Sequence, residues 1–210
     1  MTLLVATEDE LSEKVALKLI RQVRGSEEGV ECVRRNGFGF LKSNIKKYRE
    51  VAERAPVFIL TDLDQDACAP CKRKMWLRQV SSHTSFLFRI VVREIETWLL
   101  ADREAMAAFL KVSLAKIERN SESIADPKRY LLKLAQMSPK GLRTDLLPER
   151  GRRASQGFGY NERLGEFVNE KWSSQRASEN SDSLRRALTR LNECFLRPEN
   201  RFSSPSKAGS

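Results

Sequence analysis

Acidic residues suited to binding a hard cation follow one strongly apolar run of the sequence. The run 57–60 leads directly into Asp62 and Asp64. On an extended segment, residues i and i+2 project to the same side, so both carboxylates are able to face one ion. Mg²⁺ takes oxygen ligands and keeps several waters, so it needs few carboxylates. The spacing predicts a site for Mg²⁺ or Mn²⁺, although an Asp-x-Asp after a strand also serves simply to cap a helix or a turn.

Further carboxylates occupy comparable positions elsewhere in the chain. Glu8 follows the first apolar run, with Glu10 as an alternative, and Asp66 extends the group formed by Asp62 and Asp64. Without a metal, like charges this close together would repel one another. Glu8, Asp62 and Asp64 are the expected catalytic residues. The complete set of candidate metal ligands is Glu8, Glu10, Asp62, Asp64, Asp66, Glu94 and Glu96.

Glu94 and Glu96 begin a helical pattern after the apolar run 86–92. In one interpretation, one of them ligates a second metal, which would make the protein a two-metal phosphodiesterase. In the other, both are first-turn acids that interact favourably with the helix dipole. Because residues i and i+2 diverge on a helix, the two carboxylates are not expected to face the same ion. The sequence leaves both interpretations open.

Four short apolar runs are expected to form the strands that position these acids. They lie at 3–6, 29–33, 57–60 and 86–92, with helical periodicity between them. The run 57–60 is continuously apolar, which is typical of a strand covered on both faces of a parallel sheet. The order predicts an α/β fold with a mainly parallel sheet, helices on both faces and 57–60 central beside 3–6. Ligands bind at the carboxyl ends of such strands, where the acids fall.

The periodicity after Arg93 is mostly helical. Helices are expected around 95–99, 105–110, 130–134, 164–168 and 184–195. The residues after Pro198 are rich in Ser, Pro and Lys, a composition typical of disorder. The expected organisation is an α/β domain over 1–105, a helical extension over 106–197 and a disordered tail over 198–210.

The composition is that of an ordinary soluble chain with excess positive charge. Hydrophobic residues make up 40% and charged residues 31% of the chain. No apolar stretch approaches the ~20 residues needed to cross a bilayer, and the N-terminus lacks a signal-peptide pattern, so a cytoplasmic protein without a membrane partner is expected. Lys and Arg total 38 against 28 Asp and Glu, a net charge of +10, which favours a polyanionic partner such as DNA or RNA.

Other chemistries find less support in the sequence. Cys68 and Cys71 form a C-x-x-C, but a structural zinc needs four ligands and the single histidine is His83. Partly buried, reduced thiols are therefore expected. His83 is expected at the surface and Trp98 in the core. No tyrosine is placed like a topoisomerase nucleophile, and no G-x-x-x-x-G-K-[ST] motif is present.

Three segments together resemble Toprim domains, which occur in topoisomerases, primases and the overcoming-lysogenization-defect nucleases. They are V-A-T-E ending at Glu8, I-L-T-D-L-D ending at Asp64, and E-I-E-T-W-L-L-A-D from Glu94 to Asp102. Toprim domains pair a Glu after the first strand with a later Asp-x-Asp. Glu8 stands two residues later than in the common pattern, which keeps Glu10 as the alternative. The third segment is similar to one in bacterial Toprim-like proteins encoded beside an ATPase in phage-defence loci.

The resemblance covers roughly residues 1–105 and implies a Mg²⁺-dependent nuclease acting on DNA or RNA. It also implies that a partner ATPase controls this nuclease as a phage-defence effector. The alternative is a non-catalytic binding or assembly subunit of such a complex. A phosphatase or nucleotide-processing enzyme for small substrates fits the acids but leaves the net charge unexplained.

The basic, glycine-bearing loop of Arg150, Arg152 and Arg153 is expected to contact nucleic acid. Neutralising all three should weaken binding and reduce its salt dependence by up to ~0.9 per lost phosphate contact on duplex DNA. Affinity measured across a salt series checks this. Unchanged affinity and slope would make the loop a solvated connector.

Overall fold

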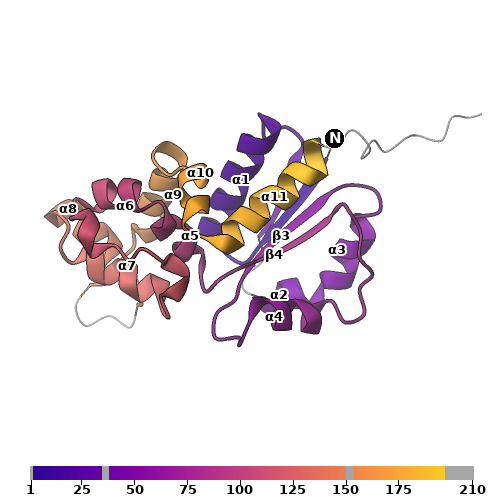
Figure 1. Ribbon diagram of the computed structural model, residues 1–210, viewed down its shortest axis with the longest axis horizontal. Coiled ribbons are helices and arrows are strands. Elements are labelled where there is room, and N and C mark those ends of the chain that lie inside the picture. The colour runs from indigo at the N-terminus through magenta and orange to yellow at the C-terminus, as the bar shows by residue number, and fades with distance from the viewer. Residues whose placement is uncertain (1, 35–37, 150–153, 197–210) are drawn as a thin grey trace, which may run out of the picture.

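The computed structural model describes residues 2–34, 38–149 and 154–196 of the chain. Its first half alternates strands and helices in the predicted order (Figure 1). The elements are β1 (Leu3–Thr7), α1 (Glu10–Arg24), β2 (Val30–Arg34), α2 (Phe38–Ser43), α3 (Ile45–Val51), β3 (Val57–Asp62), α4 (Ala69–Trp76) and β4 (Phe86–Val91).

The rest of the described chain is helical, as predicted. Its α-helices are α5 (Ile95–Ala101), α6 (Arg103–Leu110), α7 (Pro127–Ala135), α8 (Lys140–Leu146), α9 (Tyr160–Glu170), α10 (Ser174–Glu179) and α11 (Asp182–Leu196). Two short 3₁₀ turns, Leu114–Lys116 and Ser121–Ser123, connect α6 to α7. The structure describes no helix that is both long and apolar enough to cross a bilayer.

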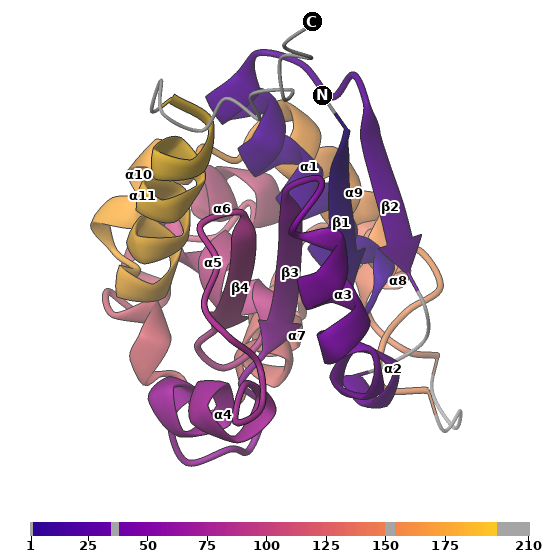
Figure 2. The same ribbon diagram turned by 90° about the vertical axis from the view of Figure 1, so that its right-hand side faces the viewer.

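The four described strands form one parallel sheet in the order β2-β1-β3-β4 (Figure 2). β1 pairs with β3 in a register that sets Leu4 opposite Val57 and Ala6 opposite Ile59. β3 therefore lies inside the sheet with β1 as a neighbour, which confirms the predicted α/β fold and the central position of 57–60. β4 is an edge strand.

Alternate side chains of each strand point to opposite faces of the sheet and enter different hydrophobic clusters. Phe58 and Leu60 of β3 join the cluster formed with α1, α5 and α11, whereas Val57 and Ile59 join the cluster formed with α3 and α4. The result is a three-layer arrangement with α1 and α11 on one face and α2, α3 and α4 on the other (Figure 1).

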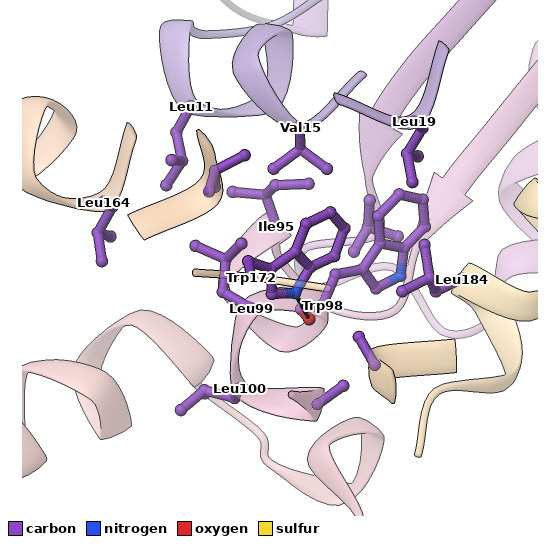
Figure 3. Packing of buried hydrophobic residues seen from close by; sticks show 14 of the residues in the cluster. Leu11, Val15, Leu19, Ile95, Trp98, Leu99, Leu100, Leu164, Trp172 and Leu184 are labelled. Atoms are coloured by element: carbon purple, nitrogen blue, oxygen red, sulfur yellow. Dashed lines mark hydrogen bonds between the residues drawn. The ribbon is translucent and has the colours of Figure 1, made fainter. Parts of the chain in front are cut away.

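The C-terminal helices extend the larger of these two clusters. Trp98 of α5 is fully buried, as predicted, and its indole N–H donates to Ser183 Oγ at 2.8 Å. The indole N–H of Trp172 donates to the Trp98 carbonyl at 2.9 Å (Figure 3). Figure 3 shows both rings among leucines of α1, α5, α9 and α11, together with Val15 and Ile95. One cluster thus joins the sheet to the helical half, and the division at residue 105 stays a prediction.

Asp102, the last residue of the third Toprim-like segment, has a structural role. It is 1% exposed, and its two carboxylate oxygens accept hydrogen bonds from the Arg176 guanidinium at 2.9 and 2.7 Å. The backbone N–H of Ser173 donates to the same carboxylate at 2.7 Å. This bidentate pair ties the end of α5 to α10, because a planar guanidinium matches the geometry of a carboxylate.

Two polar side chains set helix boundaries in the first half of the chain. The Asp9 carboxylate caps α1, since it accepts from the Ser12 N–H at 2.8 Å. Asn44 separates α2 from α3, because its side chain donates to the Phe40 carbonyl at 2.9 Å and ends α2. Such side-chain bonds to the backbone compete with helix continuation.

Replacement of Phe58 by alanine is expected to destabilise the protein by about 3–5 kcal/mol, because it leaves a cavity at the centre of β3. Denaturant unfolding measures the change in the free energy of unfolding. The control is Met75→Ala on α4, where the side chain is 52% exposed and the expected change is within about 0.5 kcal/mol. Similar losses in both variants would contradict the central position of β3.

Candidate metal and active site

The ends of β1 and β3 bring Glu8 beside Asp62. One carboxylate oxygen of Glu8 accepts a hydrogen bond from the Thr61 hydroxyl and another from the backbone N–H of Asp62, at 3.3 Å. Burial raises the pKa of Glu8, while the Thr61 bond opposes the shift because it favours the charged form. The parallel pairing of β1 with β3 therefore places Glu8 beside Asp62 at the carboxyl edge of the sheet.

Asp62 is the most strongly perturbed acid of the group. It ends β3, and burial raises the pKa of its carboxyl well above the ordinary value. The negative charges of Glu96, Asp9 and Glu8 raise that pKa further. Within the described residues, no hydrogen bond or ion pair reaches the Asp62 carboxylate. A partly buried carboxylate surrounded by other acids is a place where a cation would bind favourably.

The loop that carries Asp64 is held by hydrogen bonds to Arg93, which follows β4. Asp64 has φ 53°, in the left-handed region that aspartate tolerates better than most residues. Its N–H donates to the Arg93 carbonyl at 2.9 Å. The Arg93 guanidinium donates in return to the carbonyls of Asp64 and Asp66, at 3.0 and 3.2 Å. These bonds fix the loop that follows the central strand.

Lys72 is the functional candidate that sequence reasoning missed. Its side chain is 2% exposed, and its ammonium donates to the Asp62 carbonyl at 2.5 Å. The same ammonium lies 3.1 Å from Asp66 Oδ2 and 3.6 Å from Asp64 Oδ2. Lys72 therefore supplies a positive charge to the acidic loop from inside the protein. The local sequence does not predict the burial of Lys72, and the other lysine of α4, Lys74, is exposed.

Glu94 and Glu96 diverge, as expected from their spacing on a helix. Glu94 occupies the N-cap position of α5 and accepts from the Lys128 N–H at 3.0 Å. Glu96 is 4% exposed and accepts from the Tyr160 hydroxyl at 2.6 Å. Burial raises the pKa of Glu94, and it raises the pKa of Glu96 to about 7. Both acids stay candidate ligands, and Tyr160 is a second residue that the sequence did not single out.

Other predicted site residues lie elsewhere. Glu10 lies on α1, where its carboxylate pairs with the Lys14 ammonium at 2.9 Å. Arg150, Arg152 and Arg153 lie outside the described residues. Over residues 2–34, 38–149 and 154–196, no three acidic, histidine or cysteine side chains are placed to ligate one metal ion. The acids line the strand ends without converging on a single point.

Cys68 and Cys71 form a disulfide, with a Cα–Cα separation of 5.2 Å. This corrects the expectation of reduced thiols. Cys68 is the N-cap of α4 and its sulfur accepts from the Cys71 N–H at 3.1 Å, so the first helical turn brings residues i and i+3 together. His83 lies in the loop before β4, where its Nδ1 accepts from the Ser85 N–H at 3.2 Å.

The protein has an α/β fold in which a parallel sheet carries helices on both faces and acids at its carboxyl edge. A solved structure, the C-terminal region of the Burkholderia pseudomallei OLD protein, has a similar fold, with a TM-score of 0.50. The match covers 91% of this chain and 97% of that region, at 13% sequence identity. It confirms the predicted fold. No family model matches the chain, and no curated protein matches it significantly.

Glu96→Gln is expected to remove a pH dependence of stability. Burial raises the folded-state pKa of Glu96 from 4.5 to about 7, so the folded protein holds a proton there that the unfolded chain has released. The free energy of unfolding therefore falls as pH rises through this window. Between about pH 5 and about pH 8 the native protein should lose roughly 2–3 kcal/mol more than Glu96→Gln, which keeps an acceptor for Tyr160.

Denaturant unfolding in a metal chelator measures this difference without interference from bound cations. The matched control is Glu50→Gln, which removes an exposed carboxylate of α3 and should keep the native pH profile. An unchanged profile in Glu96→Gln would show that another group carries the titration.

Proposed function

We propose that this protein is a Mg²⁺-dependent nuclease that hydrolyses or nicks phosphodiester bonds in DNA or RNA. The observation that carries the proposal is the Asp62 carboxylate. It ends the central strand among other acids, and no cation or hydrogen-bond donor of the described residues reaches it. Carboxylate oxygens are the ligands that Mg²⁺ and Mn²⁺ prefer, so the donor set fits the ion. The structural match to the OLD protein region agrees with the nuclease that the motifs imply.

Asp62 would hold the cation together with Glu8 or Asp64, because Mg²⁺ keeps several waters and needs few carboxylates. When bound, a divalent cation activates water and neutralises the charge of the phosphate. The Thr61 hydroxyl and the Asp62 N–H orient Glu8. Because burial raises the pKa of Asp62, its carboxyl must release a proton before it binds metal, so metal affinity should rise with pH.

Lys72 and Arg93 act as positioning residues in this proposal. Lys72 balances the charges of Asp64 and Asp66, and Arg93 holds the backbone of their loop. Both cations reduce the repulsion that gathering several carboxylates would otherwise create. Glu94 and Glu96 are the candidates for a second cation, each with one carboxylate oxygen already accepting a hydrogen bond.

The role of an effector controlled by a partner ATPase belongs to the same proposal. It rests on the similarity of the segment Glu94–Asp102 to proteins encoded beside an ATPase in phage-defence loci. The chain carries no G-x-x-x-x-G-K-[ST] motif, so nucleotide hydrolysis through that motif would have to come from the partner.

A non-catalytic binding or assembly subunit is the second candidate, and Lys72 is the observation that favours it. An internal ammonium already lies between Asp64 and Asp66, where it could replace a metal permanently. Lys72→Gln separates the two proposals. In a nuclease, loss of the competing charge should tighten Mg²⁺ binding, whereas in a metal-free subunit Mg²⁺ should leave the variant unchanged.

Asp62→Asn is expected to abolish cleavage while leaving the protein folded, because it removes a charge and keeps the shape of the side chain. Plasmid nicking with Mg²⁺ measures activity, and thermal unfolding with and without Mg²⁺ measures metal binding. The native protein should gain about 2.7 kcal/mol when Mg²⁺ is at a hundred times its dissociation constant, and Asp62→Asn should gain little. Without metal the variant should be at least as stable, since carboxylate repulsion is relieved.

Glu50→Gln on α3 is the control and should cleave and respond to Mg²⁺ like the native protein. Equal stabilisation of the native protein and Asp62→Asn by Mg²⁺ would remove Asp62 from the metal site. A native protein that neither cleaves nor responds to Mg²⁺ would favour the binding subunit.

A further inference from the structure

Two cavities lie along the outer edge of β4, between α4 and α11. Their volumes are about 460 Å³ and about 390 Å³. They adjoin, because Pro70, Arg73 and Arg89 line both. Figure 2 shows β4 at the edge of the sheet, on the side where α11 and α4 lie. We call the two cavities together the β4 groove.

The β4 groove is lined by cations from three separate elements. The smaller cavity is lined by Arg73 and Lys74 of α4, Arg89 of β4, Arg190 of α11 and the nearby His83, and by no acidic residue of the described chain. The larger cavity adds Arg93 and Arg186.

Both acids of the larger cavity have partners already. Asp182 pairs with Arg186 at 2.7 Å, and Glu122 accepts from the Ser183 N–H at 2.7 Å. Arg190, which lines the smaller cavity, likewise pairs with Glu193. Asp182 and Glu193 therefore pair with cations of α11, and the charge of Glu193 also reaches Arg89.

Arg89 of β4 has a buried donor without a partner. Its Nε is buried and has no hydrogen-bond partner. A buried donor left unpaired is destabilising, and more so when it is charged. Burial and the charges of Arg73 and Arg190 together lower the pKa of Arg89 to about 10, while the charge of Glu193 opposes the shift. An anion in the groove would relieve both costs.

A simpler account of these cations is protection of the sheet edge. Charged side chains on an edge strand discourage pairing with another chain. Arg73 fits this account, since its guanidinium donates to the Phe88 carbonyl of β4 at 3.0 Å. The buried, unpaired Nε of Arg89 does not fit it, because edge protection requires only exposed charge.

We propose that the β4 groove binds the phosphate backbone of a single nucleic-acid strand and leads that strand to the acidic site. The inference rests on the proposed nuclease function and names its substrate class. The groove reaches the site directly, because Leu63 and Ala67 line its larger cavity and flank the loop of Asp64 and Asp66. Arg93, which lines the same cavity, holds that loop.

The size and lining of the groove favour a single strand over a duplex. Cavities of a few hundred Å³ accept one small ligand, and nucleotides of a flexible strand can enter them one at a time. Phosphates then meet the arginines, and the bases meet apolar residues such as Ile90 and Pro70. The phosphates of a duplex lie on a rigid cylinder, which keeps them outside such cavities.

The test measures binding by fluorescence anisotropy with a labelled strand of about 20 nucleotides, in a chelator so that no cleavage occurs. Arg73→Gln combined with Lys74→Gln removes two phosphate contacts. The salt slope should fall by about 1.4, which corresponds to a loss of about 25-fold in affinity at 0.1 M salt. Arg190→Gln changes a cation on the opposite wall, and its affinity for the strand should fall about fivefold. This variant replaces the double variant in the test if the double variant does not fold.

Lys47→Gln combined with Arg54→Gln is the matched control, because it removes two exposed cations near α3 that line neither cavity of the groove, and it should bind like the native protein. Equal losses in the control, or no loss in the groove variants, would overturn the proposal. The affinity of the groove variants for a duplex of the same length should be less than threefold below that of the native protein. An equal loss on duplex would overturn the single-strand assignment.

These outcomes are separable from failure of the nuclease proposal. In chelator, Asp62→Asn should bind the strand at least as tightly as the native protein, since Asp62 is not a groove residue and the loss of its charge only weakens repulsion of the phosphates. If the native protein cleaves and the groove variants bind the strand normally, the groove proposal is overturned and the nuclease proposal stands. If binding depends on the groove residues but the native protein does not cleave, the nuclease proposal is overturned and the groove proposal stands.

Discussion

The parallel pairing of β1 with β3 is the contact on which the candidate site depends. It sets the two strands in register so that Glu8 and Asp62 emerge beside each other at the carboxyl edge. Backbone hydrogen bonds and the burial of Phe58 and Leu60 hold this pairing against the repulsion of the acids it assembles. The packing of the central strands thus stabilises an arrangement that the charged side chains alone would oppose.

Charge balance around the acids comes from several other elements of the chain. Lys72 enters from α4, and Arg93 follows β4. Tyr160 of α9 donates to Glu96, and the negative charge of Glu96 is the largest of those that raise the pKa of Asp62. The helical half of the chain therefore contributes directly to the electrostatics of the strand ends.

The two sides of β4 separate opposite charges over a short distance. Toward β3 and the loop of Asp64, carboxylates predominate. Toward α4 and α11, the β4 groove presents arginines, among them the partly unpaired Arg89. A polyanion attracted by the arginines would be repelled by the carboxylates unless a cation bound there. The proposed strand groove and the proposed metal site therefore depend on each other electrostatically.

The pattern of the sequence predicts the four strands, their mainly parallel arrangement and the acids that follow them. A continuous apolar run such as 57–60 has few alternatives to a buried strand, and parallel strands necessarily share a carboxyl edge. The partners of the polar side chains come from the packing of the whole chain: Lys72 between Asp64 and Asp66, Tyr160 on Glu96, the Cys68–Cys71 disulfide, and α11 as one wall of the β4 groove. Except for the disulfide, where oxidation state was the open question, these contacts join elements that local periodicity cannot relate. Periodicity reports which face of an element is buried, whereas the partner of a polar side chain depends on how distant elements pack.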